Sequence, residues 1–90
     1  MTPLEKDDCD LIRALLKGKA TNVSYGDLSR LLSRAGFTES GKGGSHRTWR
    51  HPSVGRVPLV DSGGGEILPI YVKRALRKIL ETGGCGDEIT

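Results

Sequence analysis

The most constraining feature of this 90-residue sequence is a switch in hydrophobic periodicity, from helical to alternating and back to helical. Apolar side chains follow a helical spacing in residues 10–17, 24–36 and 69–82. Residues 37–60 instead contain short alternating runs that are separated by glycine and proline. The sequence therefore predicts two helices, three short strands and a third helix, in that order.

The ends of the predicted helices are marked by residues that cap or stop helices. Ser24 precedes Asp27 in a capping-box-like arrangement, and Gly36 follows the last apolar position of the second helix. Gly18 ends the first helix, and Pro69 suits the first turn of the last one. These positions predict where the first helix ends, where the second begins and ends, and where the last begins.

The middle of the chain predicts three strands, over residues 37–42, 45–51 and 56–60. Pro52 ends the second strand because proline cannot donate to a strand ladder, and Pro58 suggests that the third strand lies at an edge or contains a bulge. Strands that are joined by tight turns must run antiparallel. We therefore expect an antiparallel three-stranded sheet.

The apolar residues of these strands suffice for only one face of that sheet. We expect the helices to pack together on this face and the other face to be left to solvent or ligand. The side chains expected to face the helices are Phe37, Trp49 and Leu59.

The predicted fold is α+β and two-layered, with helices on one face of the sheet and an extra N-terminal helix. Residues 1–23 would form an N-terminal extension, residues 24–83 the main domain, and residues 84–90 a flexible tail.

Hydropathy and cysteine usage bear on the compartment. No apolar run is long enough to span a bilayer, and the acidic first ten residues differ from a secretory signal, so we expect a cytoplasmic protein without a membrane partner. Cys9 and Cys85 have no Cys-x-x-Cys neighbour and no histidine at ligand spacing, so we expect no metal site. In a reducing compartment both should be free thiols, with a disulfide between them as the alternative.

Basic residues concentrate in the second half of the chain. The net charge is +3, yet residues 41–80 hold eight Lys and Arg against two acidic residues. Five of the eight are Arg, whose planar guanidinium suits bidentate phosphate contacts. This segment indicates a polyanion-binding surface, and a merely solvated surface is the alternative.

The candidate catalytic group is His46, which follows a Gly-Gly-Ser turn at residues 43–45. Backbone amides of such a turn can approach a phosphate closely. If Trp49 faces the core, alternation places His46 on the open face together with Arg50. An imidazole beside an arginine suits general acid–base cleavage of a phosphodiester, in which arginine and backbone amides stabilise the charge on phosphorus. With RNA the ribose 2′-hydroxyl could be the attacking group, so no metal or cofactor is required.

Each of these residues also has a structural interpretation. His46 could be an ordinary exposed residue of a strand. His51 lies next to Pro52 on the predicted Trp49 side and is interpreted as a structural or rim residue. Trp49 is interpreted as a core residue, although an exposed tryptophan could stack on a base.

The chain contains the stretches DLSRLLSRAGF, GKGGSHRTWRHP, GRVPLV and LPIYVKRALRKIL. Together they resemble the HicA family of toxins, which belong to bacterial toxin–antitoxin pairs. The resemblance covers residues 27–80. Its most specific part is Gly44-Ser45-His46, followed by Trp49 and then by His51 and Pro52.

This resemblance implies a fold like that of a double-stranded-RNA-binding domain (dsRBD) and the activity of a metal-independent mRNA interferase. The motif histidine of the family, here His46, is implied to be catalytic. Many relatives carry a further histidine after the third strand, where this chain has Val60 and Asp61, so His46 would act alone. The implied partner is a HicB-type antitoxin that covers the active site.

Three functions remain open from the sequence. The first is an RNA-cleaving toxin with His46 as general acid and base. The residues expected to hold RNA are Lys42, Gly44, Ser45, Arg47, Arg50 and Arg56. The second is a noncatalytic RNA-binding module of similar fold, in which His46 only contacts a phosphate or the 2′-hydroxyl. The third is a protein-interaction domain whose basic surface meets an acidic partner.

Overall fold

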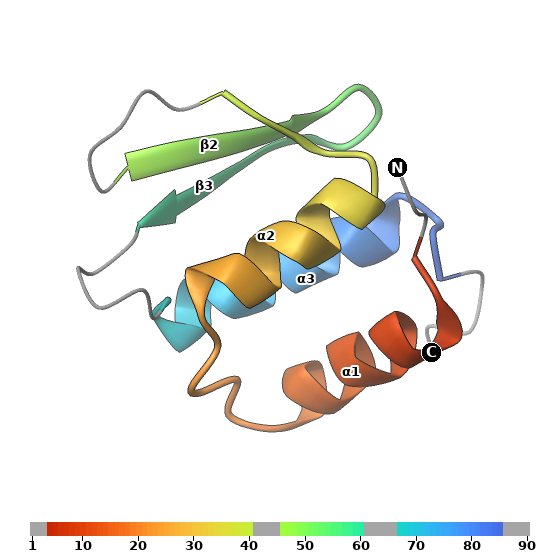
Figure 1. The fold of residues 1–90 in the computed structure, drawn as a ribbon, viewed down its shortest axis with the longest axis vertical. Helices are drawn as coiled ribbons and strands as arrows, with labels where there is room; N and C mark the ends of the chain where they lie inside the picture. The colour runs from red at the N-terminus through yellow and green to blue at the C-terminus, as the bar shows by residue number, and fades with distance from the viewer. Residues whose placement is uncertain (1–3, 41–45, 61–66, 86–90) are drawn as a thin grey trace.

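The computed structural model describes residues 4–40, 46–60 and 67–85. Its elements follow the predicted order of two helices, three strands and a helix (Figure 1). They are α1 (Lys6–Lys17), α2 (Tyr25–Arg34), β1 (Thr38–Glu39), β2 (His46–His51), β3 (Gly55–Val60) and α3 (Pro69–Glu81). The predicted α+β fold is confirmed. Within the described ranges, no helix is long and apolar enough to cross a bilayer.

The sheet is antiparallel, with the strand order β1-β2-β3. Helices α2 and α3 lie against one of its faces, and α1 lies beyond them on the side away from the sheet (Figure 1). All three helices are therefore on the same side of the sheet, as the sequence predicts. The fold is consistent with the dsRBD-like arrangement of a helix, three strands and a helix, and α1 is the extra N-terminal helix.

The hydrophobic core lies between the sheet and the helices. Phe37 and Leu59 are each 1% exposed and Trp49 is 5% exposed, so the three residues predicted to face the helices are all buried. The helices contribute Ile12, Leu28, Leu31, Leu32, Val72, Ala75, Leu76, Ile79 and Leu80. Because side chains alternate along a strand, burying Trp49 and Leu59 directs the residues beside them to the open face.

The predicted helix ends are largely confirmed. The backbone N–H of Asp27 donates to the Ser24 hydroxyl at 3.1 Å, which makes Ser24 the N-cap of α2. Gly36 follows α2 with a φ of +98°, a backbone conformation that favours glycine. Pro69 stands in the first turn of α3.

Helix α1 begins four residues earlier than the predicted start at Asp10. The added turn is polar apart from Cys9, so its residues carry no apolar stripe that hydrophobic periodicity could detect. Asp8 stabilises this turn, because its carboxylate accepts a hydrogen bond from the Glu5 backbone at 2.9 Å and from Arg34 of α2 at 2.7 Å. Burial raises the pKa of Asp8, but these two donors outweigh it and hold the pKa below its usual value.

The first strand is shorter than predicted. Residues 37–42 were expected to be extended, whereas β1 spans Thr38–Glu39 and residues 41–42 lie outside the described ranges. Pairing continues by one residue, because the backbone N–H of Ser40 donates to the Thr48 carbonyl at 2.8 Å. The alternation that marks a strand cannot be recognised in two residues.

The expectation of free thiols is wrong, because Cys9 and Cys85 form a disulfide with their Cα atoms 5.7 Å apart. Helix α1 packs against α3, and this contact brings Cys9 beside the residues that follow α3. A sequence separation of 76 residues gives no indication of that proximity. Cys85, which lies in the predicted flexible tail of residues 84–90, is half-buried and packed against the core.

Reduction of the Cys9–Cys85 disulfide should lower the free energy of unfolding by up to about 4 kcal/mol, because the bridge closes a loop of nearly the whole chain. Urea unfolding with and without reductant measures this difference. The double variant Cys9→Ser/Cys85→Ser is the control, since reductant should leave its midpoint unchanged. An equal midpoint for oxidised and reduced wild type would show that the bridge does not stabilise the fold.

Candidate nucleic-acid interface

Two arginines face each other across the open side of the sheet. Arg50 of β2 and Arg56 of β3 are register partners, and Thr38 of β1 pairs with Arg50 on its other side. All three side chains are exposed, and neither arginine forms an ion pair with another described residue. Like charges placed opposite each other destabilise a sheet. The pair is therefore an unneutralised site that suits an anionic ligand.

The two arginines border a shallow depression of about 430 Å³ on the surface beside the turn that joins β2 and β3. Thr38, Arg50 and Arg56 line it, together with residues of that turn. Guanidinium groups at this depression can donate several hydrogen bonds to the oxygens of one phosphate. The described part of the open face can thus bind a phosphodiester.

His46 lies at the start of β2, and its backbone pairs with Val60 of β3. Its side chain lies outside the described part of the chain, as do the predicted RNA-binding residues Lys42, Gly44 and Ser45. His46 lies four positions before Arg50 in the same strand, and alternation places positions that differ by an even number on the same face. Because the His46 side chain is not described, its exposure on the open face stays a prediction.

Arg47 does not join Arg50 and Arg56. It belongs to the alternate set of β2 residues that includes Trp49, and its guanidinium donates to the Glu39 carboxylate at 3.0 Å. The same guanidinium lies over the ring of Tyr25, 5.3 Å from the centroid. These contacts hold Arg47 against the start of α2 and β1.

Tyr25 connects the elements around Arg47. The indole N–H of Trp49 donates to the Tyr25 hydroxyl at 3.0 Å, and that hydroxyl donates to Glu39. Burial and the carboxylate together raise the pKa of Tyr25 to about 12. The Tyr25 hydrogen bond, with Arg47 nearby, outweighs burial and lowers the pKa of Glu39. A carboxylate and a neutral phenol therefore fix α2 against β1 and β2.

No sequence pattern indicates that Tyr25 and Glu39 belong to this arrangement. Tyr25 is simply the first residue of α2, and fourteen residues separate it from Glu39. The proximity arises only when α2 packs on the sheet. The one sequence signal is the general rule that a buried tryptophan needs an acceptor for its N–H.

His51 occupies a structural position, in agreement with its interpretation from the sequence. Its Nδ1 accepts a hydrogen bond from the Ser53 backbone at 3.0 Å. Its ring lies against Phe37, with the ring centroids 5.0 Å apart. These contacts stabilise the turn between β2 and β3.

A search of the described residues for metal ligands finds no cluster of three or more His, Cys, Asp or Glu that could hold an ion. The groups that the described open face offers are guanidinium donors and hydroxyls. Such groups bind phosphate directly.

The fold and this face define an α+β protein of the dsRBD-like kind with a basic, unneutralised sheet face. Residues 25–82 match the family model described as HicA toxin of bacterial toxin-antitoxin. The match spans α2, the whole sheet and α3, which is well over half of the chain, so the chain belongs to the HicA toxin family. Membership implies an antitoxin partner. Searches of curated proteins and of solved structures returned no match.

Substitution of Tyr25 by Phe should destabilise the fold by about 1–3 kcal/mol, because the buried indole N–H of Trp49 loses its acceptor. Urea unfolding followed by Trp49 fluorescence measures the loss.

Since the pKa of Tyr25 is raised, the contribution of its hydroxyl to the free energy of unfolding should be complete below pH 10 and should disappear as the pH rises through about 12. Tyr71→Phe is the matched control, because the Tyr71 hydroxyl has no hydrogen bond within the described residues. An equal effect of both substitutions would show that the Tyr25 hydroxyl has no such role.

Proposed function

We propose that this HicA family member is an endoribonuclease that cleaves mRNA without a metal and uses His46 as its proton-transfer group. The observation that carries the proposal is the pair of unneutralised arginines, Arg50 and Arg56, on the open face of the sheet whose central strand contains His46. Family membership over residues 25–82 supports the assignment, because the match includes this strand.

In the proposed reaction the ribose 2′-hydroxyl attacks the adjacent phosphorus, and the bond from phosphorus to the 5′-oxygen breaks. The products are a 2′,3′-cyclic phosphate and a free 5′-hydroxyl. The imidazole of His46 accepts the proton of the 2′-hydroxyl, and the leaving 5′-oxygen takes a proton from water. The imidazolium then gives its proton to the hydroxide so formed, so the protons balance and the neutral imidazole is regenerated. Charge increases on the phosphoryl oxygens as the new bond forms, and positioned guanidinium donors stabilise it.

The proposed RNA contacts differ in how they would act. Arg50 and Arg56 would bind phosphate directly, since both are exposed and have no ion-pair partner in the described chain. Arg47 donates a hydrogen bond to Glu39, so its main role would be to hold β2 in position and a contact with RNA would be secondary. Lys42, Gly44 and Ser45 remain proposed contacts from the segment before β2.

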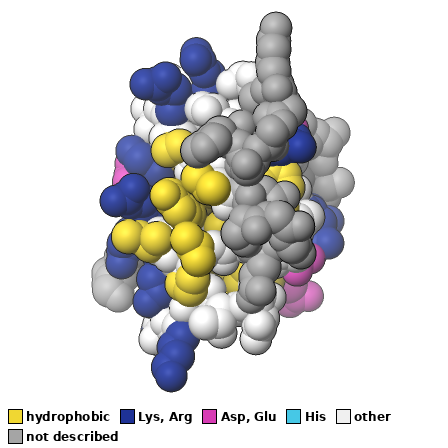
Figure 2. Space-filling model, turned by 90° about the vertical axis from the view of Figure 1, so that its left-hand side faces the viewer, with side chains coloured by type: hydrophobic (Ala, Val, Ile, Leu, Met, Phe, Trp, Pro, Cys, Tyr) yellow, Lys and Arg dark blue, Asp and Glu magenta, His cyan; other side chains and the backbone are white. Residues whose placement is uncertain are grey.

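The proposed partner is a HicB-type antitoxin that inhibits by covering the open face. Acidic side chains opposite Arg50 and Arg56 would block RNA by both sterics and charge. Leu68 and Ile70, at the start of α3 in the helix layer, are 51% and 57% exposed and would serve as apolar anchors if the same protein extends past the sheet to α3. Figure 2 shows hydrophobic side chains gathered on this side of the molecule with Lys and Arg around them.

The second candidate function is a noncatalytic RNA-binding module of the same fold. The arginine pair supports it equally, because binding phosphate requires no proton transfer. The two functions differ only in what His46 does. A test must therefore separate cleavage from binding.

The variant His46→Ala should lose RNA cleavage by at least about 100-fold and keep RNA affinity within a few-fold, because general acid–base catalysis contributes that much to rate. Cleavage is measured on a labelled RNA, and affinity on its 2′-deoxy analogue, which cannot be cleaved. His51→Asn is the matched variant, since His51 is the other histidine of the chain. Full cleavage by His46→Ala, or a loss confined to His51→Asn, would overturn the proposed role.

The cleavage rate should also change within about one or two pH units of 6.5, where an imidazole gains or loses its proton. Single-turnover rates from pH 5 to 8.5 test this. A rate that is constant across this range would exclude an imidazole as the proton-transfer group.

A further inference from the structure

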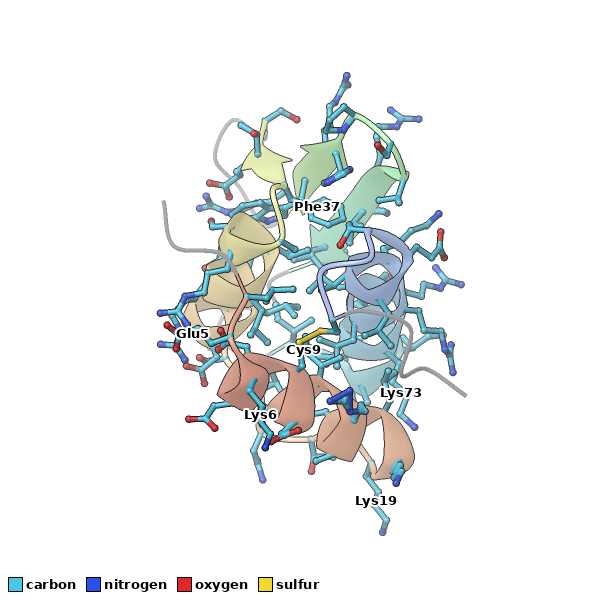
Figure 3. All side chains as sticks on the ribbon, turned by 90° about the vertical axis from the view of Figure 1, so that its right-hand side faces the viewer. Glu5, Lys6, Cys9, Lys19, Phe37 and Lys73 are labelled. Atoms are coloured by element: carbon cyan, nitrogen blue, oxygen red, sulfur yellow. A yellow bond between two sulfur atoms is a disulfide. The ribbon has the colours of Figure 1, made fainter. Side chains whose placement is uncertain are left out.

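A second basic groove lies between the edge strand β3 and helix α3, outside the residues that sequence reasoning assigned to RNA. It has a volume of about 240 Å³ and an apolar floor of Val57 and Pro58. Its cationic lining residues are Arg56, Arg74, Arg77 and Lys78. Figure 3 shows side chains that end in nitrogen along the outer side of α3, below the sheet.

Among the described residues, the charges of this groove are mostly uncompensated. Glu81 is the one acidic residue in its described lining, and it lies 3.5 Å from Lys78, which also donates to the Val54 carbonyl at 3.2 Å. Arg74 and Arg77 are exposed and have no ion pair among the described residues. Like charges three or four residues apart destabilise a helix. Their clustering on one side of α3 suits an anion that neutralises them together.

Arg56 belongs to both basic regions. It pairs with Arg50 on the open face, and it also lines the groove against α3. Since β3 is an edge strand of the described sheet, no further described strand lies between these two regions. A continuous track of arginines therefore runs from the open face over β3 to Arg74 and Arg77, and we call it the β3 track.

We propose that the groove between β3 and α3 binds phosphates of the same RNA strand that lies on the open face, so that the RNA crosses the β3 edge along this track. This inference rests on the proposed function, in which RNA is the substrate. The lining favours RNA over an acidic protein. The exposed large hydrophobic residues of the described chain, Leu11, Leu68 and Ile70, all lie outside the groove, and protein interfaces use such anchors.

The test is the salt dependence of binding to a 2′-deoxy oligonucleotide, which cannot be cleaved. The double variant Arg74→Gln/Arg77→Gln should bind about tenfold more weakly at 0.1 M salt. Its slope of log affinity against log salt should be shallower by about 1.4, because two single-strand phosphate contacts are lost. The charge-conserving variant Arg74→Lys/Arg77→Lys should keep most of the wild-type slope.

Lys17→Gln/Lys19→Gln is the matched control, since it removes the same charge from the end of α1. In Figure 3, Lys19 lies at the opposite end of the molecule from the sheet. This control should keep the wild-type slope to within about 0.3. Circular dichroism of each variant establishes that the fold is retained, as expected for exposed positions.

The experiment distinguishes failure of the proposed function from failure of the inference about the groove. If wild type binds no oligonucleotide, the proposed function itself fails. If wild type binds and the groove variant matches the α1 control, the inference alone is overturned. If the groove variant keeps RNA binding but loses its antitoxin in co-purification, the groove serves the protein partner and the RNA assignment is wrong.

Discussion

The architecture depends on one constraint, that the apolar residues of the sheet are sufficient to cover only one of its faces. Trp49, Val57 and Leu59 are buried against the helices, so their strand neighbours must lie on the other side. Arg50 and Arg56 thereby become exposed register partners. The same alternation that forms the core thus creates the basic face, and both are consequences of one pattern.

Sequence reasoning found what local chemistry determines. The order of elements, the cap at Ser24, the left-handed Gly36 and the buried Trp49 all follow from spacing and residue type. It gave the Cys9–Cys85 disulfide only as the alternative to free thiols and missed the Tyr25 hydrogen bonds, because both join residues that only tertiary packing brings together. It also began α1 too late, since a polar helical turn has no hydrophobic period.

The candidate site was predictable in the same partial way. Alternation in β2 separates Arg50 from Arg47, and the structure shows that this separation matters, because Arg47 is held by Glu39. The groove with Arg74 and Arg77 could not be inferred, since it requires α3 to lie beside the β3 edge. Membership of the HicA toxin family implies an antitoxin partner. Figure 1 shows α1 on the side of α2 and α3 that faces away from the sheet, and the disulfide joins α1 to the residues that follow α3, so both support the fold without occupying the basic sheet face.

We propose that RNA binds the open sheet face, continued over β3. Backbone amide NMR shifts during titration with a 2′-deoxy oligonucleotide test this proposal. The largest changes should fall on β2, β3 and the outer side of α3, with α1 unaffected. Changes concentrated on α1, with none around Arg50 and Arg56, would contradict it.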